Sequence, residues 1–142
     1  MKNEKTNTGA NRVGMPFILI QDGDFAGMVL VLDSNAYSNY LSLDIYKQLK
    51  DLLEPIDVSC DVEGVNEIKL VNGSVAIRGN HINMLFLVDK ATDYYKYLSE
   101  ILGVPVCGII GTQFMSDHNW KIDHERRLII IPDYDSDYLA IN

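Results

Sequence analysis

The apolar residues of this chain fall in short runs, and most of these runs end at residues typical of turns. Phe25–Leu32 and Val104–Ile110 are examples, and no run approaches the roughly 20 apolar residues that a membrane-spanning helix needs. Short apolar runs between turn residues indicate strands rather than long helices. We therefore expect a mainly β protein, built as a small barrel or sandwich with a few short helices inserted.

The strand boundaries are clearest near the start of the chain and least clear in its middle. Met15–Gln21 and Phe25–Leu32 are apolar runs separated by Asp22-Gly23-Asp24, which predicts two strands joined by a turn. Further on, Asn72-Gly73 and Gly79-Asn80 are both hairpin signals. The pairing register in this part of the chain therefore stays open.

Two segments, Leu43–Leu53 and Thr92–Leu102, have the residue spacing of amphipathic helices. Tyr94 and Tyr97 lie three residues apart in the second segment and so share one face of the helix. We expect that face to pack in the core. A third segment, Thr112–Trp120, is long enough for one further short helix.

The 142 residues include 12 Lys and Arg against 20 Asp and Glu, a formal net charge of −8. Nucleic acids and anionic membranes select basic surfaces, so the charge argues against both as partners. The length fits one domain over residues 15–131, between a flexible arm (1–14) and an acidic tail (132–142). The arm holds no apolar segment of the kind a secretory signal requires, which predicts a cytoplasmic protein; a signal upstream of Met1 stays an open alternative.

Patterns that would hold a metal ion or a cofactor fail on inspection. The run Asp133–Asp137 has Asp at every second position, as in a calcium loop, but Tyr138 stands where that loop needs glycine. The three histidines share no close ligand spacing. Cys60 and Cys107 are too few for a disulfide scaffold, and we expect buried free thiols. We therefore expect no metal ion and no cofactor.

One segment does combine chemically useful residues. Met28–Ser42 is an apolar strand that ends at a single carboxylate and continues into a turn and a helix. The turn contains Asp33, Ser34, Asn35 and Ala36. Later in the chain an apolar strand ends in Ile109, Ile110 and Gly111, and residues 122–129 form part of a predicted hairpin.

In order and spacing, these elements resemble those of the retropepsin-like aspartic protease family, including its bacterial members. Asp33–Ala36 is similar to the family's Asp-Thr/Ser-Gly-Ala element, and Ile109–Gly111 is similar to its apolar-apolar-Gly element. Residues 122–129 are similar to its terminal hairpin, so the resemblance covers roughly Met15–Ile131. It implies a mainly β fold, the closed β-barrel half of a retropepsin-like protein with a few short helices.

The resemblance also implies an active site. Family members place the Asp at the base of a cleft under a β-hairpin flap, which here would fall near residues 62–68 and contain Gly64, Val65 and Asn66. The chain holds one such Asp, so the resemblance implies a homodimer in which Asp33 faces Asp33′ of a second copy. Ser34 would then make a hydroxyl contact across the two-fold axis. The implied activity is endopeptidase cleavage of a peptide or protein substrate.

Two residues depart from the family pattern. Asn35 stands where the family has glycine; Asn tolerates a positive φ, so we expect the loop to form with the Asn35 side chain beside the cleft. Gln113 stands where Asp or Asn is usual. Three interpretations therefore remain: an aspartic endopeptidase, a catalytically impaired module for peptide binding or dimerisation, and an unrelated β-barrel in which Asp33–Asn35 only leads into a helix.

Overall fold

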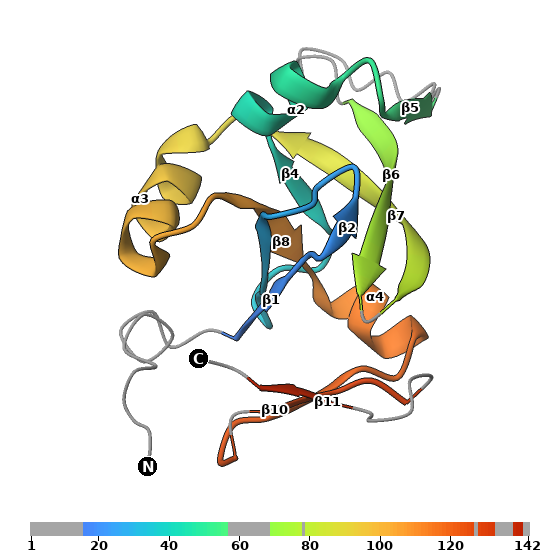
Figure 1. The fold of residues 1–142 in the computed structure, drawn as a ribbon, viewed down its shortest axis with the longest axis vertical. Coiled ribbons are helices and arrows are strands. Elements are labelled where there is room, and N and C mark those ends of the chain that lie inside the picture. The colour runs from blue at the N-terminus through green and yellow to red at the C-terminus, as the bar shows by residue number, and fades with distance from the viewer. Residues whose placement is uncertain (1–15, 57–68, 78, 127, 133–137, 141–142) are drawn as a thin grey trace.

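The computed structural model describes residues 16–56, 69–77, 79–126, 128–132 and 138–140 (Figure 1). Eight strands of this part form one sheet. They are β1 (Phe17–Leu19), β2 (Asp22–Gly23), β3 (Val29–Leu32), β4 (Tyr40–Ser42), β5 (Glu54–Ile56), β6 (Leu70–Ile77), β7 (Asn80–Asp89) and β8 (Val106–Ile110). Neighbouring strands follow the order β1-β3-β8-β4-β7-β6-β2, and β5 pairs with β6.

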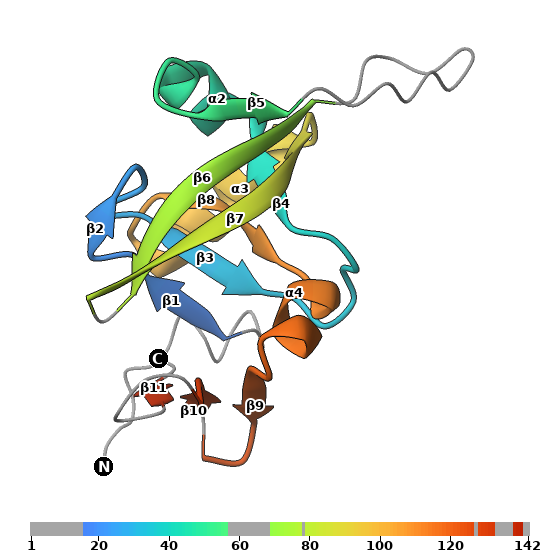
Figure 2. The same ribbon diagram turned by 90° about the vertical axis from the view of Figure 1, so that its right-hand side faces the viewer.

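The sheet curls into a half-barrel. β1 and β2 stand at opposite ends of the strand order, yet only Ile20 and Gln21 separate them in sequence. The two ends of the sheet must therefore lie close together, and Figure 2 shows the long β6–β7 hairpin crossing over the shorter strands. The expected strands on either side of Asp22-Gly23-Asp24 are present as β1 and β3, which pair antiparallel. The predicted turn is only partly correct, because Asp22 and Gly23 form β2 on β6 and the second strand begins at Val29 rather than Phe25. The expectation of a mainly β fold with a few short helices is confirmed.

The β6–β7 hairpin turns at the second of the two candidate turn signals. β6 and β7 pair without interruption from Leu70–Leu87 to Ile77–Asn80, so Gly79-Asn80 lies at the turn. Asn72-Gly73 lies inside β6, where packing explains the glycine. A Cβ at Gly73 would stand 2.6 Å from the ring of Phe25, which is fully buried. The local turn signal is therefore overridden by a tertiary contact.

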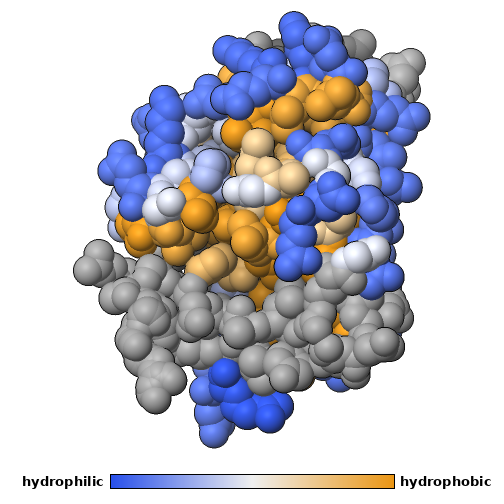
Figure 3. Space-filling view, in the orientation of Figure 1, coloured by the Kyte–Doolittle hydropathy of each residue, from blue (hydrophilic) through white to orange (hydrophobic). Residues whose placement is uncertain are grey.

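Most buried side chains lie inside the curl of the sheet. Phe25 and Phe86 meet edge to face there, with ring centroids 5.6 Å apart, and Trp120 packs similarly on Phe114. Figure 3 shows hydrophobic residues over the central strands and hydrophilic residues around them. Burial of these apolar side chains is the main favourable contribution to folding.

The described residues also form the helices α2 (Leu43–Leu49), α3 (Thr92–Leu102) and α4 (Thr112–Asp117). α3 has the predicted bounds and ends at Gly103, whose φ of +74° suits glycine. α2 and α4 end earlier than predicted. Leu53 remains buried after α2 although it lies outside the helix. Leu53 fits the apolar pattern because it contacts the core, and not because the helix continues to it.

The prediction that the face of α3 with Tyr94 and Tyr97 packs in the core is wrong. Tyr95 and Leu98 are buried, whereas Tyr94 is 36% exposed and Tyr97 is 60% exposed. The buried positions continue through half-buried Leu102, which is four residues beyond Leu98. An apolar stripe at this spacing fixes which side of the helix meets the sheet. The aromatic pair considered in the sequence lies outside that stripe.

A second, smaller sheet contains β9 (Lys121–Asp123), β10 (Leu128–Ile130) and β11 (Tyr138–Ala140). β10 pairs antiparallel with both neighbours, so the hairpin expected near residues 122–129 is present as β9 and β10. β11 was not foreseen, because its residues lie in the segment expected to be an acidic tail. Within the described residues, no helix is both long and apolar enough to cross a membrane.

Candidate active site

Asp33 lies immediately after β3, where two parallel strands end side by side. Leu32 of β3 is in register with Ile110 of β8, and the Asp33 backbone N–H donates to the Ile110 carbonyl at 3.0 Å. The Ala36 N–H then donates to the Asp33 carbonyl at 3.1 Å, which closes a tight turn. The sheet therefore holds the backbone of Asp33 at the carboxyl ends of β3 and β8.

The Asp33 carboxylate is held within its own turn. Its Oδ1 accepts a hydrogen bond from the Asn35 N–H at 2.9 Å, which fixes the orientation of the carboxylate within the turn. Asp33 is half-buried, whereas Ser34 and Asn35 are exposed. Asn35 does not adopt a positive φ, so the loop closes without the left-handed conformation expected there. The bond to Asp33 uses only the backbone of residue 35, so it does not require glycine.

β8 passes between β3 and β4 and supports the loop that joins them. β3 runs parallel to β8, and β4 pairs antiparallel on its other side. A Cβ at Gly111 would stand 2.6 Å from the Tyr37 carbonyl oxygen and closer still to that of Ser38. Only glycine allows the two backbones to approach this closely. The structure thus brings Asp33–Ala36 and Ile109–Gly111 together.

Hydrogen bonds fasten the loop to the residues that follow β8. The Thr112 N–H donates to the Ala36 carbonyl at 2.8 Å, and the Gln113 N–H donates to the Tyr37 carbonyl at 3.1 Å. The Gly111 N–H donates to Asn39 Oδ1 at 2.9 Å in a buried position. Asn39 was not singled out in the sequence. Its role depends on a contact with a residue 72 positions away, for which the local sequence carries no signal.

Helix α3 covers the outer face of β3 and β8 beside the Asp33 loop. Tyr95 and Leu98 pack there with Val31 and Ile109, and Ala36 of the loop joins the edge of this cluster. Figure 1 shows α3 standing next to β8. The helix is also tied down by polar contacts, since the Tyr95 hydroxyl donates to Asp89 at 2.7 Å. α3 is therefore part of the surroundings of Asp33.

Tyr94 connects α3 to the Asp33 carboxylate electrostatically. Partial burial, followed by the negative charge of Asp33, raises the pKa of the Tyr94 hydroxyl. The effect of such a charge increases as the two groups approach and as their surroundings become less polar. Sequence reasoning missed this residue because it assigned Tyr94 to the core and had no means to place α3 against β3.

The remaining sequence candidates contribute less to the site. Gly64, Val65 and Asn66, the expected flap, lie outside the described residues, as does Cys60. Cys107 is a buried free thiol, and burial raises its pKa to about 12. Within the described ranges, no three His, Cys, Asp or Glu side chains are grouped as metal ligands.

Gln113, the second departure from the family pattern, has defined partners. It accepts a hydrogen bond from the Tyr37 hydroxyl and donates from Nε2 to Asp117 Oδ1 at 2.8 Å. The side chain points along α4 and bridges the loop to the helix. Its longer side chain is thus accommodated at the surface.

Comparison with known proteins gives matches at the level of structure. No protein-family model matches the chain, and the search of curated proteins found no match. The crystal structure of the retroviral protease-like domain of Ddi1 from Leishmania major matches with a TM-score of 0.53 and 18% identity, covering 90% of this chain and 91% of that one. EIAV protease complexed with the inhibitor HBY-793 matches with a TM-score of 0.45 and 19% identity, covering 77% of this chain and 90% of that one.

The similarity to the Ddi1 domain extends over nearly the whole of both chains, and at this identity it concerns the fold alone. It agrees with the mainly β architecture and the curled sheet described above. The chain therefore has a retropepsin-like fold, with Asp33 in the loop that follows β3.

Proposed function

We propose that this chain is an aspartic endopeptidase that works as a homodimer, with Asp33 and Asp33′ of a second copy as its catalytic pair. The Asp33–Ala36 loop carries the proposal. The loop presents one half-buried carboxylate at the carboxyl end of β3 and holds it by a hydrogen bond from the backbone N–H of Asn35. A retropepsin-like fold with one such loop per chain suits a two-fold arrangement, in which the same surface of each copy meets the other.

The proposed chemistry follows from placing two carboxylates together. At a separation of about 3 Å they cannot both ionise, so they share one proton and titrate as a unit. The ionised member takes a proton from a water molecule, whose oxygen attacks the carbonyl carbon of the peptide bond, while the protonated member donates to the carbonyl oxygen. The carboxyl group that took the proton from water then gives it to the amine nitrogen, while the other carboxylate takes a proton back from a hydroxyl of the tetrahedral intermediate. The carbon–nitrogen bond breaks, a carboxylic acid and an amine leave, and the pair returns to its starting state.

A peptide-binding or dimerisation module without catalysis is the second candidate, and the surroundings of Asp33 favour it. Tyr94 lies within the field of the Asp33 charge, and buried Tyr95 holds α3 on the adjoining face of the sheet. The exposed Asn35 side chain follows directly in the loop. We infer that the Asn35 side chain, two residues after Asp33, hinders the approach of a substrate backbone to that carboxylate.

Activity is tested by digestion of an unfolded protein substrate at acid pH. We expect wild type to cleave it and Asp33→Asn to abolish cleavage while circular dichroism and sedimentation stay unchanged. Asp51→Asn, at an exposed position after α2, is the matched control and should retain activity. Loss of folding in Asp33→Asn would instead identify a structural carboxylate. Asn35→Gly should raise activity if the side chain at residue 35 obstructs the substrate.

The homodimer is tested separately by cross-linking. A disulfide requires Cα atoms within about 7 Å, so Ser34→Cys should form a covalent dimer under mild oxidation if two loops meet at a two-fold axis. Ser116→Cys, exposed on α4, is the control, and both variants carry Cys60→Ser. A protein that sediments as a monomer, or that cross-links equally at both positions, would refute the paired arrangement. A cross-linked dimer without peptidase activity would support the module instead.

A further inference from the structure

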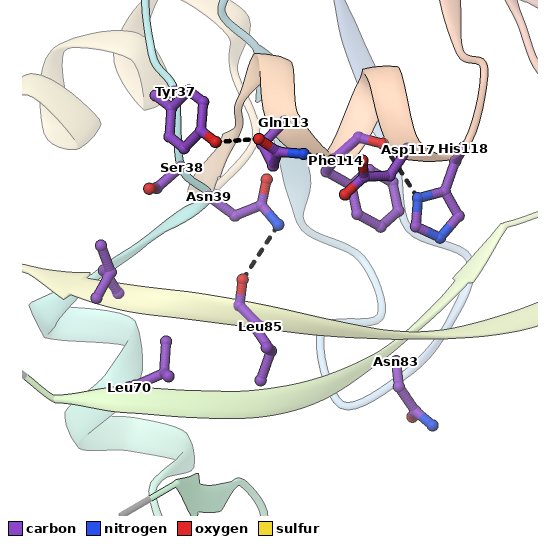
Figure 4. A pocket seen from close by; sticks show the side chains of 11 residues that line it. Tyr37, Ser38, Asn39, Leu70, Asn83, Leu85, Gln113, Phe114, Asp117 and His118 are labelled. Atoms are coloured by element: carbon purple, nitrogen blue, oxygen red, sulfur yellow. Dashed lines mark hydrogen bonds between the residues drawn. The ribbon is translucent and has the colours of Figure 1, made fainter. Parts of the chain in front are cut away.

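A cavity of 390 Å³ lies between α4 and the β6–β7 hairpin, and Asp33 is not among its lining residues (Figure 4). Its volume is at the lower end of the range for small-ligand sites, about 300–1,000 Å³. Tyr37 and Ser38 of the loop form one part of its wall. None of these residues belongs to the proposed catalytic pair, so the cavity is considered independently of it.

The two sides of the cavity differ in character. Leu70, Leu85 and Leu87 provide an apolar surface from β6 and β7, and the Leu85 side chain is 51% exposed. Across from them lie Phe114 of α4 and His118, the residue that follows α4, whose rings are stacked with centroids 3.9 Å apart. An aliphatic group between these surfaces would remove apolar area from water on both sides.

The polar groups on the wall are partly used within the protein, and their pattern indicates which ligand fits. The Tyr37 hydroxyl donates to Gln113, and Gln113 Nε2 donates to Asp117 Oδ1. Asn39 donates to the Leu85 carbonyl at 3.1 Å and accepts from Gly111. These contacts fix the hydroxyl and the two amide groups in place.

The positions left over on α4 are hydrogen-bond acceptors. Asp117 has a second carboxylate oxygen, Oδ2, with no partner in the described part of the chain. His118 Nδ1 lies 3.0 Å from the Phe114 carbonyl, which can only accept, so Nδ1 carries the hydrogen. In the neutral ring, His118 Nε2 is then an acceptor. A ligand that satisfies both atoms must donate.

The charges of the lining and of the whole chain also favour a ligand that donates hydrogen bonds. Among the described residues that line the cavity, Asp117 is the one acidic side chain and none is Lys or Arg, and the chain as a whole carries a formal net charge of −8. We propose that this cavity binds an alkyl cation, an ammonium or guanidinium group on an aliphatic stem, as in a lysine or arginine side chain. The stem lies between the leucines and Phe114, and the cation donates to Asp117 and His118.

The test compares a blocked heptapeptide containing one lysine with the same peptide containing norleucine, which keeps a linear aliphatic side chain without the charge. Binding is followed by amide chemical shifts of the ¹⁵N-labelled full chain near neutral pH. We expect the lysine peptide to shift the signals of Tyr37, Leu85 and Phe114 and to bind more tightly than the norleucine peptide. Equal binding of the two peptides, or shifts confined to other parts of the chain, would overturn the proposal.

Asp117→Asn keeps an oxygen for the Gln113 contact and removes the charge. It should weaken binding of the lysine peptide about fivefold, the scale of an exposed ion pair, and leave the norleucine peptide unaffected. Asp51→Asn removes the same charge elsewhere and should change neither affinity by more than a small factor. An equal loss in both variants would show attraction by net charge alone and would contradict a specific site.

A second ligand distinguishes the source of the cation. n-Hexylamine, added without a peptide, should shift the same signals if a free amine suffices, and it should fail to do so if a polypeptide backbone is also needed. Failure of both hexylamine and the lysine peptide would overturn the proposal. The measurement is repeated with Asp33→Asn, which leaves the lining unchanged. Binding there without cleavage separates the cavity from the proposed peptidase function.

Discussion

Replacing Gly111 by alanine tests whether the close contact between β8 and the Asp33 loop supports the fold. Gly111 has φ −94° and ψ 178°, extended backbone that alanine adopts freely, so the substitution carries no penalty of backbone conformation. The new Cβ would instead meet the carbonyl oxygens of Tyr37, at 2.6 Å, and Ser38. Both are backbone atoms held by the loop, so the loop has to move.

The expected cost follows from what that movement breaks. The hydrogen bonds from the N–H groups of Gly111, Thr112 and Gln113 all end on the loop, at Asn39, Ala36 and Tyr37. Losing them at about 1 kcal/mol each lowers the free energy of unfolding by about 3 kcal/mol. For a chain of this length, that corresponds to a fall in Tm of roughly 10 °C.

Urea unfolding followed by circular dichroism measures the effect, with Gly103→Ala as the matched control. A Cβ at Gly103 meets nothing within 4 Å, but its φ of +74° is unfavourable for alanine, so we expect a loss of about 1 kcal/mol. If Gly111→Ala costs no more than Gly103→Ala, the two backbones are not in close contact. The position of β8 under the loop would then be wrong.

Three further predictions concern titratable groups. Asp33→Asn should lower the pKa of Tyr94 toward its ordinary value, because a charge that disfavours tyrosinate is removed. The ultraviolet titration of Tyr94 is obtained by subtracting the titration of a Tyr94→Phe variant. A titration that Asp33→Asn leaves unchanged would contradict the proximity of Tyr94 and Asp33. Burial and the hydrogen bond to Asp89 raise the pKa of Tyr95, so the unfolded chain loses this proton first and stability falls as pH rises above about 10. Tyr95→Phe should make that fall shallower in urea unfolding. In a Cys60→Ser background, Cys107 should react with a thiol reagent only on unfolding, because burial raises its pKa to about 12, and rapid labelling of the native protein would refute this.

The parts of the fold that the sequence predicts well are those that depend on neighbouring residues. The strand ending at Asp33, the tight turn after it and the apolar strand ending at Gly111 are each visible in a few consecutive residues. The retropepsin-like fold could therefore be expected from their order. Where a distant residue decides, local patterns fail: Gly73 has the signature of a turn, but Phe25 packs against it inside β6.

The surroundings of Asp33 could not be predicted for the same reason. The sequence of Thr92–Leu102 predicts a helix, but it does not predict that Tyr95 packs beside β3 or that Tyr94 lies near Asp33. The cavity likewise joins the loop, α4 and the β6–β7 hairpin, which are separated by tens of residues. The spacing of apolar residues predicts which side of a helix or strand is buried. Which other element packs on that side depends on the fold of the whole chain.

The loop of residues 33–39 links the two proposed sites mechanically. Asp33 begins it, Tyr37 and Ser38 line the cavity, and Asn39 ends it with a buried hydrogen bond to Gly111. A substitution that moves the loop will therefore disturb both sites together, and loss of activity in such a variant would not identify the residue responsible. Asp33→Asn and Asp117→Asn avoid this difficulty, because each changes one carboxylate and leaves the backbone contacts in place. Independent effects of these two variants would show that the two sites function separately although the same loop contributes to both.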